Sequence, residues 1–597
     1  MTTHQTNPKE AVLDLLEAAL ADTEGAPDRE ALRGALSRPP DAARGDVAFP
    51  VFPLAKLLRN APPKIAAELA QKITDGLDGN SLVARVEAAG PYLNFFTHAG
   101  RVLCGLLESI GSGAWGKDLQ ADTAQRVMVE FSQPNTHKVL HVGHLRNIAV
   151  GDALQRVLRA RGHGVVSANY YGDFGIDVAK CLWWLREHPE DTAPETQRGA
   201  WLGQAYAAAS AHIADLEDKG DKQAVQELFA ELKSILERIV AGDAELEPLY
   251  RETRRWCLDE FAEVYRWLDV EFDTDFFESE LDEAGQKIVD EYLGKGVFEQ
   301  SQGAIICDLE KFDLGPALVR KSDGTSLYMT WDLVLASRKF EEFDIERSLY
   351  VVASEQSYHF RQLFATLERM GYGRAKDCRH VAYELVMMAE GKMSSRKGKV
   401  VTYADVRDSI STAIESKMRA DDRDSRDDWS EERWDRTVRT IAAACMRYGM
   451  VSVGNTTRVV FDAEAWTSLE GETGAYLLYG LARIRGVFRK AGEVTDAQLV
   501  AGAREADEFG AEAERALLSH LLRAGEVLAT VERTTDVSGL ATWIYEGVRA
   551  FSRFYHDCPI LNAPAPLREA RLGLARAAEH VLGDGLRTLG IEPLDEM

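Results

Sequence analysis

Residues 126–158 decide the architecture of the central part of the chain, and they run RVMVEFSQPNTHKVLHVGHLRNIAVGDALQRVL. The segment 127–131 is nearly all apolar, which is typical of a buried strand. After a loop, apolar residues recur at helical spacing at Val150, Leu154, Val157 and Leu158. A second strand is expected at 165–170. Strand, helix and strand in this order predict a parallel βαβ unit in a doubly wound α/β sheet.

The chain is long and acidic, with 597 residues, a formal net charge of −26 and a sequence pI near 5.1. Its length predicts about three to five domains. A strongly negative protein is a poor general binder of nucleic acid. Because binding depends on local patches, a nucleic-acid-binding chain of this charge must gather its Lys and Arg on one face.

The first residues of the chain and its cysteines indicate the cellular compartment of the protein. The polar first ten residues show no secretory signal, and no apolar run reaches the about 18 residues that would span a membrane. The seven cysteines form no C-x-x-C pair; they are Cys104, Cys181, Cys257, Cys307, Cys378, Cys445 and Cys558. We therefore expect neither structural zinc nor disulfides, and a cytoplasmic protein without a membrane partner.

The sequence pattern divides the chain into three parts. Residues 1–115 predict a small α/β domain, with a linker at 111–122. Residues 122–405 predict the α/β sheet domain, with a charged and mostly helical insertion at about 182–300. Short strands are expected at 304–307, 317–319, 349–353 and 381–386. Residues 406–597 predict an all-helical bundle.

His141-Val142-Gly143-His144 lies where the first strand's loop meets the following helix. Helix N-termini at the carboxyl ends of strands bind phosphates, and Gly143 permits a ring or a phosphate to approach the backbone. Two imidazoles three residues apart point the same way and can donate hydrogen bonds to a phosphoryl group that gains charge. On its own, H-x-x-H can equally be half of a zinc site or two surface histidines.

A second candidate segment, 391–399, is GKMSSRKGK. Lysines supply mobile positive charge, and Ser and Gly permit backbone contacts, so such a loop suits a polyphosphate. Taken alone, an exposed basic surface loop explains it as well.

Together these segments resemble the signatures of class I aminoacyl-tRNA synthetases, in the order that the family has them. HVGH resembles the HIGH signature, and the longer string from Glu130 through Asn135 and Lys138 to Arg146 is similar to arginyl-tRNA synthetases. The resemblance implies a Rossmann-like catalytic domain of the HIGH superfamily. It also implies ATP contacts from His141, Gly143 and His144. The segment 172–175, GDFG, is similar to the family's GDWG, with Phe in place of Trp.

The basic segment resembles the KMSKS signature, which stabilises the departing pyrophosphate. Ser395 stands at the position of the second lysine and Arg396 follows. Many arginyl-tRNA synthetases share this loss and carry a lysine three residues before the first signature histidine, where Lys138 stands here. The resemblance implies ATP-binding roles for Lys392, Met393, Ser394, Ser395 and Arg396, with Lys138 and Lys392 joining the two histidines as catalytic residues.

The amino-acid pocket must select a planar guanidinium, which requires carboxylates in bidentate geometry. Tyr328 and Asp332 are four residues apart, on one face of an expected helix start. Without the other motifs, an amphipathic helix with a solvated acid would be the default. By resemblance, Tyr328 and Asp332 contact the guanidinium, Glu130 and Asn135 contact the arginine, and Gln356 lies near its α-amino group.

The flanking segments extend the resemblance to nearly the whole chain. Residues 90–96 resemble the end of the family's N-terminal tRNA-contacting domain, and 474–485 the start of its anticodon-binding bundle. The implied reaction activates L-arginine with ATP, which carries Mg²⁺, and loads it onto the 2′-hydroxyl of the terminal adenosine of tRNA(Arg), giving AMP and pyrophosphate. We expect a monomer without a protein metal site.

Two alternatives remain open at this point. Another enzyme of the same nucleotide-binding superfamily would share the first signature, although the expected guanidinium pocket argues against it. A synthetase paralogue that binds tRNA without activity would keep the fold, although the intact signatures argue against that.

Overall fold

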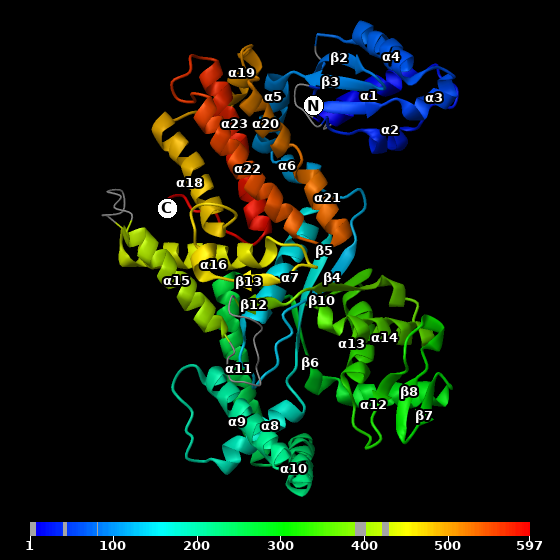
Figure 1. Cartoon of the computed structure of the whole chain (residues 1–597), viewed down its shortest axis with the longest axis vertical. Coiled ribbons are helices and arrows are strands. Elements are labelled where there is room, and N and C mark those ends of the chain that lie inside the picture. The colour runs from blue at the N-terminus through cyan, green and yellow to red at the C-terminus, as the bar shows by residue number, and fades with distance from the viewer. Residues whose placement is uncertain (1–6, 40–43, 80, 389–400, 421–428) are drawn as a thin grey trace.

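The computed structural model describes residues 7–39, 44–79, 81–388, 401–420 and 429–597. Figure 1 shows a small N-terminal domain in blue, a central α/β part in cyan and green, and a helical C-terminal part in yellow to red. The central sheet lies between the C-terminal helices and two lobes that extend away from them.

Five parallel strands form the central sheet in the order β11-β10-β4-β5-β6. They are β4 (Arg126–Glu130), β5 (Gly164–Tyr171), β6 (Thr274–Phe277), β10 (Arg347–Ala353) and β11 (Cys378–Tyr383). Val127 and Val129 of β4 share a core with α7 (Val142–Ala160), whereas Met128 packs on the opposite face with α13 (Tyr328–Phe343) and α14 (Ser357–Arg369). Helices therefore cover both faces, and the predicted βαβ unit and doubly wound sheet are confirmed.

The strand order reverses at β4, whose neighbours are β5 on one side and β10 on the other. In open α/β sheets, such a reversal opens a ligand crevice at the carboxyl ends of the two strands. The segments leaving those ends are 131–141 and the 3₁₀ turn η5 (Ser354–Gln356). The fold thus brings together two loops that are far apart in the chain.

The structure of the first lobe differs from part of the predicted helical insertion at 182–300. Its helices are α8 (Ile176–Glu187), α9 (Arg198–Asp218), α10 (Lys222–Val240) and α11 (Leu246–Leu268), and they contribute to a separate hydrophobic core. The helical part ends at Leu268, because Thr274–Phe277 is β6, a strand of the main sheet. The prediction extended too far since four residues within a charged stretch are too few to show a strand period.

The second lobe is a small antiparallel sheet with a helix. Its strands β7 (Phe298–Ser301), β8 (Ala304–Cys307) and β9 (Ala317–Arg320) pair in chain order, beside α12 (Asp282–Gly294). The strands expected at 304–307 and 317–319 are therefore present, but in this separate sheet. Within the described residues, 3₁₀ turns also occur at η3 (Glu278–Glu280) and η4 (Glu310–Phe312), and η6 (Ala375–Asp377) lies between α14 and β11 of the main sheet.

The N-terminal domain is an antiparallel sheet, β1-β3-β2, covered by helices. Its elements are α1 (Pro8–Leu20), α2 (Arg29–Ala35), β1 (Val47–Pro50), α3 (Phe52–Leu58), α4 (Pro62–Gly76), β2 (Val83–Ala89) and β3 (Tyr92–Thr97). Its own core extends only to Phe95. The next helix, α5 (Ala99–Gly111), packs against the C-terminal helices, where a Cβ at Gly100 would lie 2.3 Å from the carbonyl oxygen of Ala503. The stretch predicted as one domain to residue 115 therefore divides between two cores.

As far as residues 401–420 and 429–597 are concerned, the C-terminal part is helical apart from one short strand. Its helices are α15 (Tyr403–Ala420), α16 (Glu431–Val451), α17 (Ala463–Trp466), α18 (Gly474–Ala491), α19 (Asp496–Glu505), α20 (Glu512–Leu521), α21 (Ala524–Thr534), α22 (Ser538–Asp557) and α23 (Leu567–Thr588). The exception to the all-helical prediction is β13 (Val459–Phe461), which pairs in parallel with β12 (Val386–Met388). None of the helices in the described part of the chain combines the length and apolar character that crossing a membrane requires.

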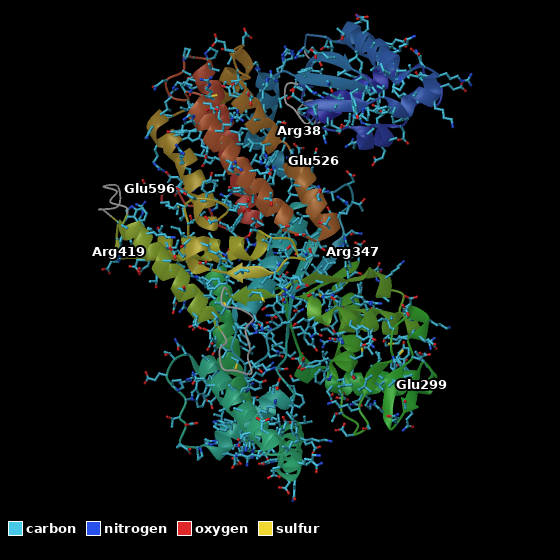
Figure 2. All side chains as sticks on the ribbon, viewed as in Figure 1. Arg38, Glu299, Arg347, Arg419, Glu526 and Glu596 are labelled. Atoms are coloured by element: carbon cyan, nitrogen blue, oxygen red, sulfur yellow. The ribbon has the colours of Figure 1, made fainter. Side chains whose placement is uncertain are left out.

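Charged side chains join the three parts. Lys9 of the N-terminal domain forms an ion pair with Glu526 of α21, and Figure 2 shows Arg38 near the same carboxylate. Fully buried Arg447 of α16 donates to Asp152 Oδ2 of α7 at 2.7 Å and to the carbonyl of Leu268. Because a buried charge is stable only when it is paired and hydrogen-bonded, this contact fixes the C-terminal helices against the helix of the first signature.

Candidate active site

The loop that follows β4 is held in an unusual backbone conformation. Ser132, Gln133 and His137 have φ angles of 77°, 47° and 61°, which side-chain-bearing residues seldom adopt. Interior side chains hold them there: the Ser132 amide donates to Asn147 Oδ1 at 2.6 Å and the Gln133 amide to Asn169 Oδ1 at 3.0 Å. Strain of this kind persists only where the surroundings enforce it, and it is concentrated at functional sites.

His141 and His144 form a reciprocal cap at the start of α7. The Gly143 amide donates to Nδ1 of His141 at 3.1 Å, and the His141 amide donates to Nδ1 of His144 at 3.2 Å. The ring centroids are 4.0 Å apart, as the three-residue spacing predicts. Since Nδ1 is the acceptor in both rings, each neutral imidazole carries its proton on Nε2, which leaves two N–H donors for a ligand.

Burial keeps this pair neutral. It lowers the pKa of His141, and it holds the pKa of His144 well below the ordinary histidine value, with the neighbouring His141 adding to the effect. The glycine between them is required by the cap itself, because a Cβ at Gly143 would lie 2.9 Å from Cε1 of His141. The pair is therefore a set of preorganised neutral donors.

The basic segment with Lys392, Met393, Ser394, Ser395 and Arg396 lies outside the described residues. The described chain resumes at Val401, directly against the first signature. The Val142 amide donates to the Val401 carbonyl at 3.1 Å, and His141 forms an antiparallel bridge with Thr402. The chain that follows the second signature segment thus joins the backbone of the histidine pair.

Lys138 lies in the same crevice and remains a cation. Its Nζ is 2.5 Å from Asp177 Oδ2 and lies over the ring of Tyr206. Burial opposes the charge of Lys138, but Asp177 outweighs burial and raises the pKa of the ammonium. Because Asp177 also binds Lys180, it holds two cations near the loop.

Tyr328 and Asp332 occupy the first turns of α13, as the spacing predicts. Tyr328 is 60% exposed, so its ring is open to a ligand, and Asp332 Oδ2 is 2.6 Å from Nε2 of His359 on α14. Gln356 ends η5 and is exposed. A carboxylate with one oxygen already bound can offer the other to a guanidinium.

Glu130 and Asn135 contact other residues of the protein, in addition to the arginine contact that the sequence predicts for them. The Glu130 carboxylate is buried, lies 2.5 Å from the ammonium of fully buried Lys339, and accepts from Gln133 Nε2 at 3.0 Å. Asn135 forms a backbone bridge with Gly172, where its Oδ1 fills the space of an absent Cβ. Lys339 anchors α13 to β4, and the contact of both residues with arginine stays a prediction.

Glu278 is a site residue that the sequence patterns missed. It directly follows β6, is 5% exposed, and lies close enough to Asp332 for their charges to interact. Burial raises its pKa well above the ordinary value, and the nearby carboxylates Asp173 and Asp332 add to this. The neighbouring Ser279 donates from its amide and hydroxyl to Asp173, at 2.9 and 2.8 Å, which fixes the turn.

Tyr170 completes an acidic slot, which we define by Tyr170, Glu278, Tyr328 and Asp332. Among the described residues, its buried hydroxyl has no hydrogen-bond partner. Burial and the charges of Asp332, Glu278 and Glu130 hold the pKa of Tyr170 well above its ordinary value, so the hydroxyl stays protonated. A buried hydroxyl without a described partner can form a hydrogen bond with a polar ligand that enters the slot.

Comparison with known proteins decides the family. Residues 111–463 match the family of tRNA synthetases class I (R), catalytic domain, 477–597 the DALR anticodon binding domain, and 10–97 the arginyl tRNA synthetase N terminal domain. An arginine–tRNA ligase of Bdellovibrio bacteriovorus is 36% identical over 572 residues, covering 94% of each chain. The chain belongs to the arginyl-tRNA synthetase family. A Clostridioides difficile member is 30% identical over 99% of each chain.

Solved structures of arginyl-tRNA synthetases share the fold. The Thermus thermophilus enzyme superimposes with a TM-score of 0.77 at 24% identity, over 99% of this chain and 100% of its own. The Plasmodium falciparum enzyme gives 0.74 at 17% identity, over 99% and 98%. The class I sheet, the N-terminal domain and the helical C-terminal domain predicted from sequence are thereby confirmed.

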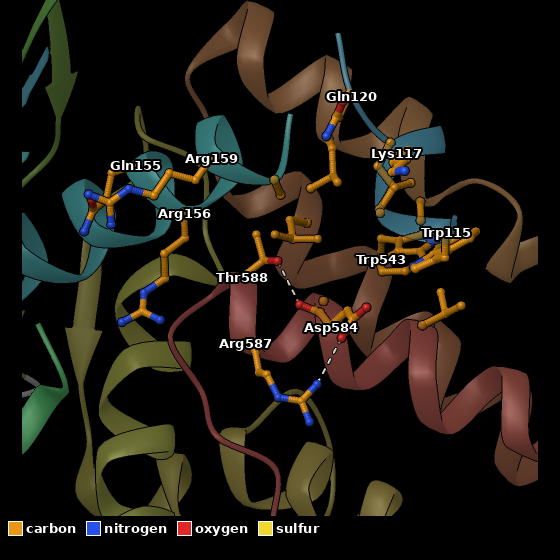
Figure 3. Close-up of a pocket in the computed structure, with 18 of the residues that line it drawn as sticks. Trp115, Lys117, Gln120, Gln155, Arg156, Arg159, Trp543, Asp584, Arg587 and Thr588 are labelled. Carbon is orange, nitrogen blue, oxygen red and sulfur yellow. Dashed lines mark hydrogen bonds and ion pairs between the residues drawn. The ribbon is translucent and has the colours of Figure 1, made fainter. Parts of the chain in front are cut away.

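A large cavity of about 820 Å³ lies away from this synthetase site (Figure 3). It is lined by Trp115 of α6 (Trp115–Asp118), by Gln155 and Arg159 of α7, and by Trp543 and Arg587 of the bundle. At a helical rise of about 1.5 Å per residue, the α7 residues that line it are roughly 20 Å from the histidine pair. The cavity is therefore not part of the candidate active site.

Proposed function

We propose that this chain is an arginine–tRNA ligase that forms arginyl-adenylate from L-arginine and ATP and transfers arginine to tRNA(Arg). The observation that carries the proposal is the acidic slot, in which Glu278 and Tyr328 lie within charge-interaction range of Lys138, as His141 also does. One buried acid, one partly buried acid and a hydroxyl without a described partner suit a guanidinium, which offers five N–H donors and never loses its charge. The named relatives, arginine–tRNA ligases, support the same substrate.

In the first step, the arginine carboxylate attacks the α-phosphorus of ATP, and the bond to the pyrophosphate oxygen breaks. The two Nε2–H donors stabilise charge that develops on the phosphate oxygens, and Lys138 supplies positive charge nearby. We assign Lys392, Met393, Ser394, Ser395 and Arg396 to the departing pyrophosphate. Asn135 and Glu130 remain our proposed further contacts for arginine, and Gln356 our proposed residue near its α-amino group. No protein nucleophile is required, because positioning and charge stabilisation carry the rate.

Mg²⁺ enters as part of the ATP substrate. Across the described residues, no group of three or more His, Cys, Asp and Glu gathers at metal-binding distance. Mg²⁺ keeps several waters and binds through substrate phosphates, so an ATP-borne ion needs no such cage.

In the second step, the 2′-hydroxyl of the terminal adenosine attacks the adenylate carbonyl and AMP departs. The three-part layout supports tRNA binding across the N-terminal and C-terminal domains. We further propose that the enzyme works as a monomer in the cytoplasm. We keep the predicted boundary near residue 405 between the sheet domain and the helical part, and we place the end of the N-terminal domain near Phe95, where its own core ends.

Charging assays test the proposal with three amino acids. Arginine should be loaded onto purified tRNA(Arg), whereas lysine and citrulline should not, since lysine lacks the planar fork and citrulline lacks the charge. ATP–pyrophosphate exchange should require tRNA, as in other members of the family. Preferential charging with lysine would refute the arginine assignment, and exchange without tRNA would refute the tRNA requirement. Binding of tRNA without any charging would instead favour an inactive paralogue.

A further inference from the structure

One side chain outside the acidic slot is aimed at its key carboxylate. His359 lies in the first turn of α14, and its Nε2 is 2.6 Å from Asp332 Oδ2. Both side chains are largely buried, at 24% and 18% exposure. A contact this short between two shielded groups restricts the rotamer of the aspartate.

The contact leaves one oxygen of Asp332 for a ligand. A neutral imidazole can donate its Nε2–H to Oδ2, so that Oδ1 remains available to a guanidinium N–H. Holding the acceptor in place before arginine arrives reduces the ordering cost of binding. Removal of the imidazole would free the carboxylate to rotate toward solvent.

Protonation of the imidazole changes the charge that arginine meets. Histidine is the side chain whose ordinary titration falls between about pH 5 and 8. A neutral His359 leaves the full negative charge of Asp332 to the guanidinium, whereas a charged His359 forms an ion pair with Asp332 and opposes a second cation. The protonated imidazole and the arginine guanidinium therefore compete for the carboxylate of Asp332.

The charged groups around His359 come from several elements. Asp332 faces it from α13, with Glu278 beyond, and His380 faces it from β11. On η5, Glu355 precedes it, and on β9 Arg320 is bound to Asp290. The last neighbouring element, η6, carries Lys376 and Asp377 at the far end of α14, about 15 Å along the helix. Asp332 is thus the charge in direct contact.

We propose that His359 is a positioning residue for arginine, whose imidazole aims Asp332 at the guanidinium and weakens arginine binding when it becomes protonated. The proposal rests on the arginine–tRNA ligase function given above. It names a residue that does not touch the reacting atoms and acts only through Asp332.

Steady-state charging across pH tests this with three variants. As the pH falls from about 8 to about 6, the wild-type KM for arginine should rise roughly tenfold, within the usual range of coupling between two linked ligands. His359→Gln keeps an N–H donor but cannot titrate, so its KM should stay flat. His359→Ala loses the donor, so its KM should be high at every pH while the KM for ATP is unchanged.

The matched control is His556→Gln, which alters an exposed pair between His556 Nδ1 and Asp557 Oδ1 at 2.8 Å on the surface. It should keep the wild-type pH dependence. A His359→Gln enzyme with the wild-type slope, or a His359→Ala enzyme with wild-type KM at high pH, would overturn the proposal. Wild-type protein that charges no arginine at any pH would instead refute the ligase function, so the two failures are distinguishable.

A binding measurement tests the same contact without turnover. At pH 8, calorimetry should show arginine binding about tenfold more weakly to His359→Ala than to the wild type, because Asp332 is no longer held by the imidazole. Equal affinity of the two proteins would also overturn the proposal.

Discussion

The two halves of the active site are built in opposite ways. The histidine pair occupies four consecutive residues and caps itself, with backbone amides fixing both rings. The acidic slot takes Tyr170 from β5, Glu278 from the end of β6, and Tyr328 and Asp332 from α13. Phosphate chemistry can thus be organised by one helix start, whereas recognition of a flat cation needs acids that only the folded sheet brings together.

The largest effect is expected in the slot. Asp332→Asn keeps the shape but removes the charge opposite the guanidinium, and losing one member of a buried charge pair costs about 2–5 kcal/mol. The value of kcat/KM for arginine should fall by roughly 10³-fold, with the KM for ATP unchanged. Charging kinetics with each substrate varied in turn measure both quantities.

Glu342→Gln is the control for this substitution, because Glu342 lies on the same helix but faces solvent and pairs with Arg338. It should charge like the wild type. If Asp332→Asn raised the KM for ATP as much as that for arginine, the separation of the two halves would be wrong.

The next effect belongs to the histidine pair. His144→Ala removes one preorganised donor, and losing such a donor lowers kcat by about 10²–10³-fold. The KM for arginine should be unaffected, and His144→Gln should recover part of the rate because its amide can donate from a similar position. An Ala variant that raises only the KM for arginine would contradict the assignment of the pair to ATP.

The sequence alone predicts the geometry of the histidine pair, which is the half of the site built from neighbouring residues. A strand before and a helix after HVGH predict where the rings lie, since their geometry depends on residues within one helical turn. The same holds for Tyr328 and Asp332, which share the start of one helix. Local spacing can be recognised in a sequence because the backbone alone sets it.

The rest depends on tertiary contacts that no local spacing encodes. Glu278 follows a four-residue strand within a charged stretch, so nothing nearby distinguishes it from a solvated acid. The ion pair that occupies Glu130 is likewise made by Lys339, far along the chain. The parallel pairing of β5 with β6 brings Glu278 beside Tyr170, and Asp332 joins them from α13.

A smaller effect is expected from the glycine inside the cap. In Gly143→Ala the new Cβ would lie 2.9 Å from the His141 ring, so the ring must shift by several tenths of an ångström. A shift of a preorganised donor by this amount should lower kcat by about tenfold. The matched substitution is Gly116→Ala, where a Cβ meets nothing within 4 Å, and it should leave kcat unchanged. Equal activity of the two variants would show that the cap geometry does not matter.

The smallest expected effect is a difference between the two halves in how they contribute to folding stability as the pH falls. Burial lowers the pKa of His137, which supports the loop of the histidine pair, to about 3. The unfolded chain, with an ordinary histidine pKa near 6.5, then binds more protons than the folded one, so stability is full above about pH 6.5 and is lost as the pH falls toward 3. Glu278 has the opposite sign, because its raised pKa favours the folded state in acid.

Urea unfolding at several pH values measures this difference. Between about pH 6 and pH 5, the wild type should lose about 1.2 kcal/mol of unfolding free energy through His137 alone. In His137→Gln that loss should disappear, although the variant starts from lower stability because the ring's contacts with Thr136 and Thr253 at 2.9 Å are altered. The exposed His556→Gln should keep the wild-type slope. An identical slope in His137→Gln would mean that the acid response of the histidine half arises elsewhere, with His144, whose pKa is also depressed by burial, as the next residue to substitute.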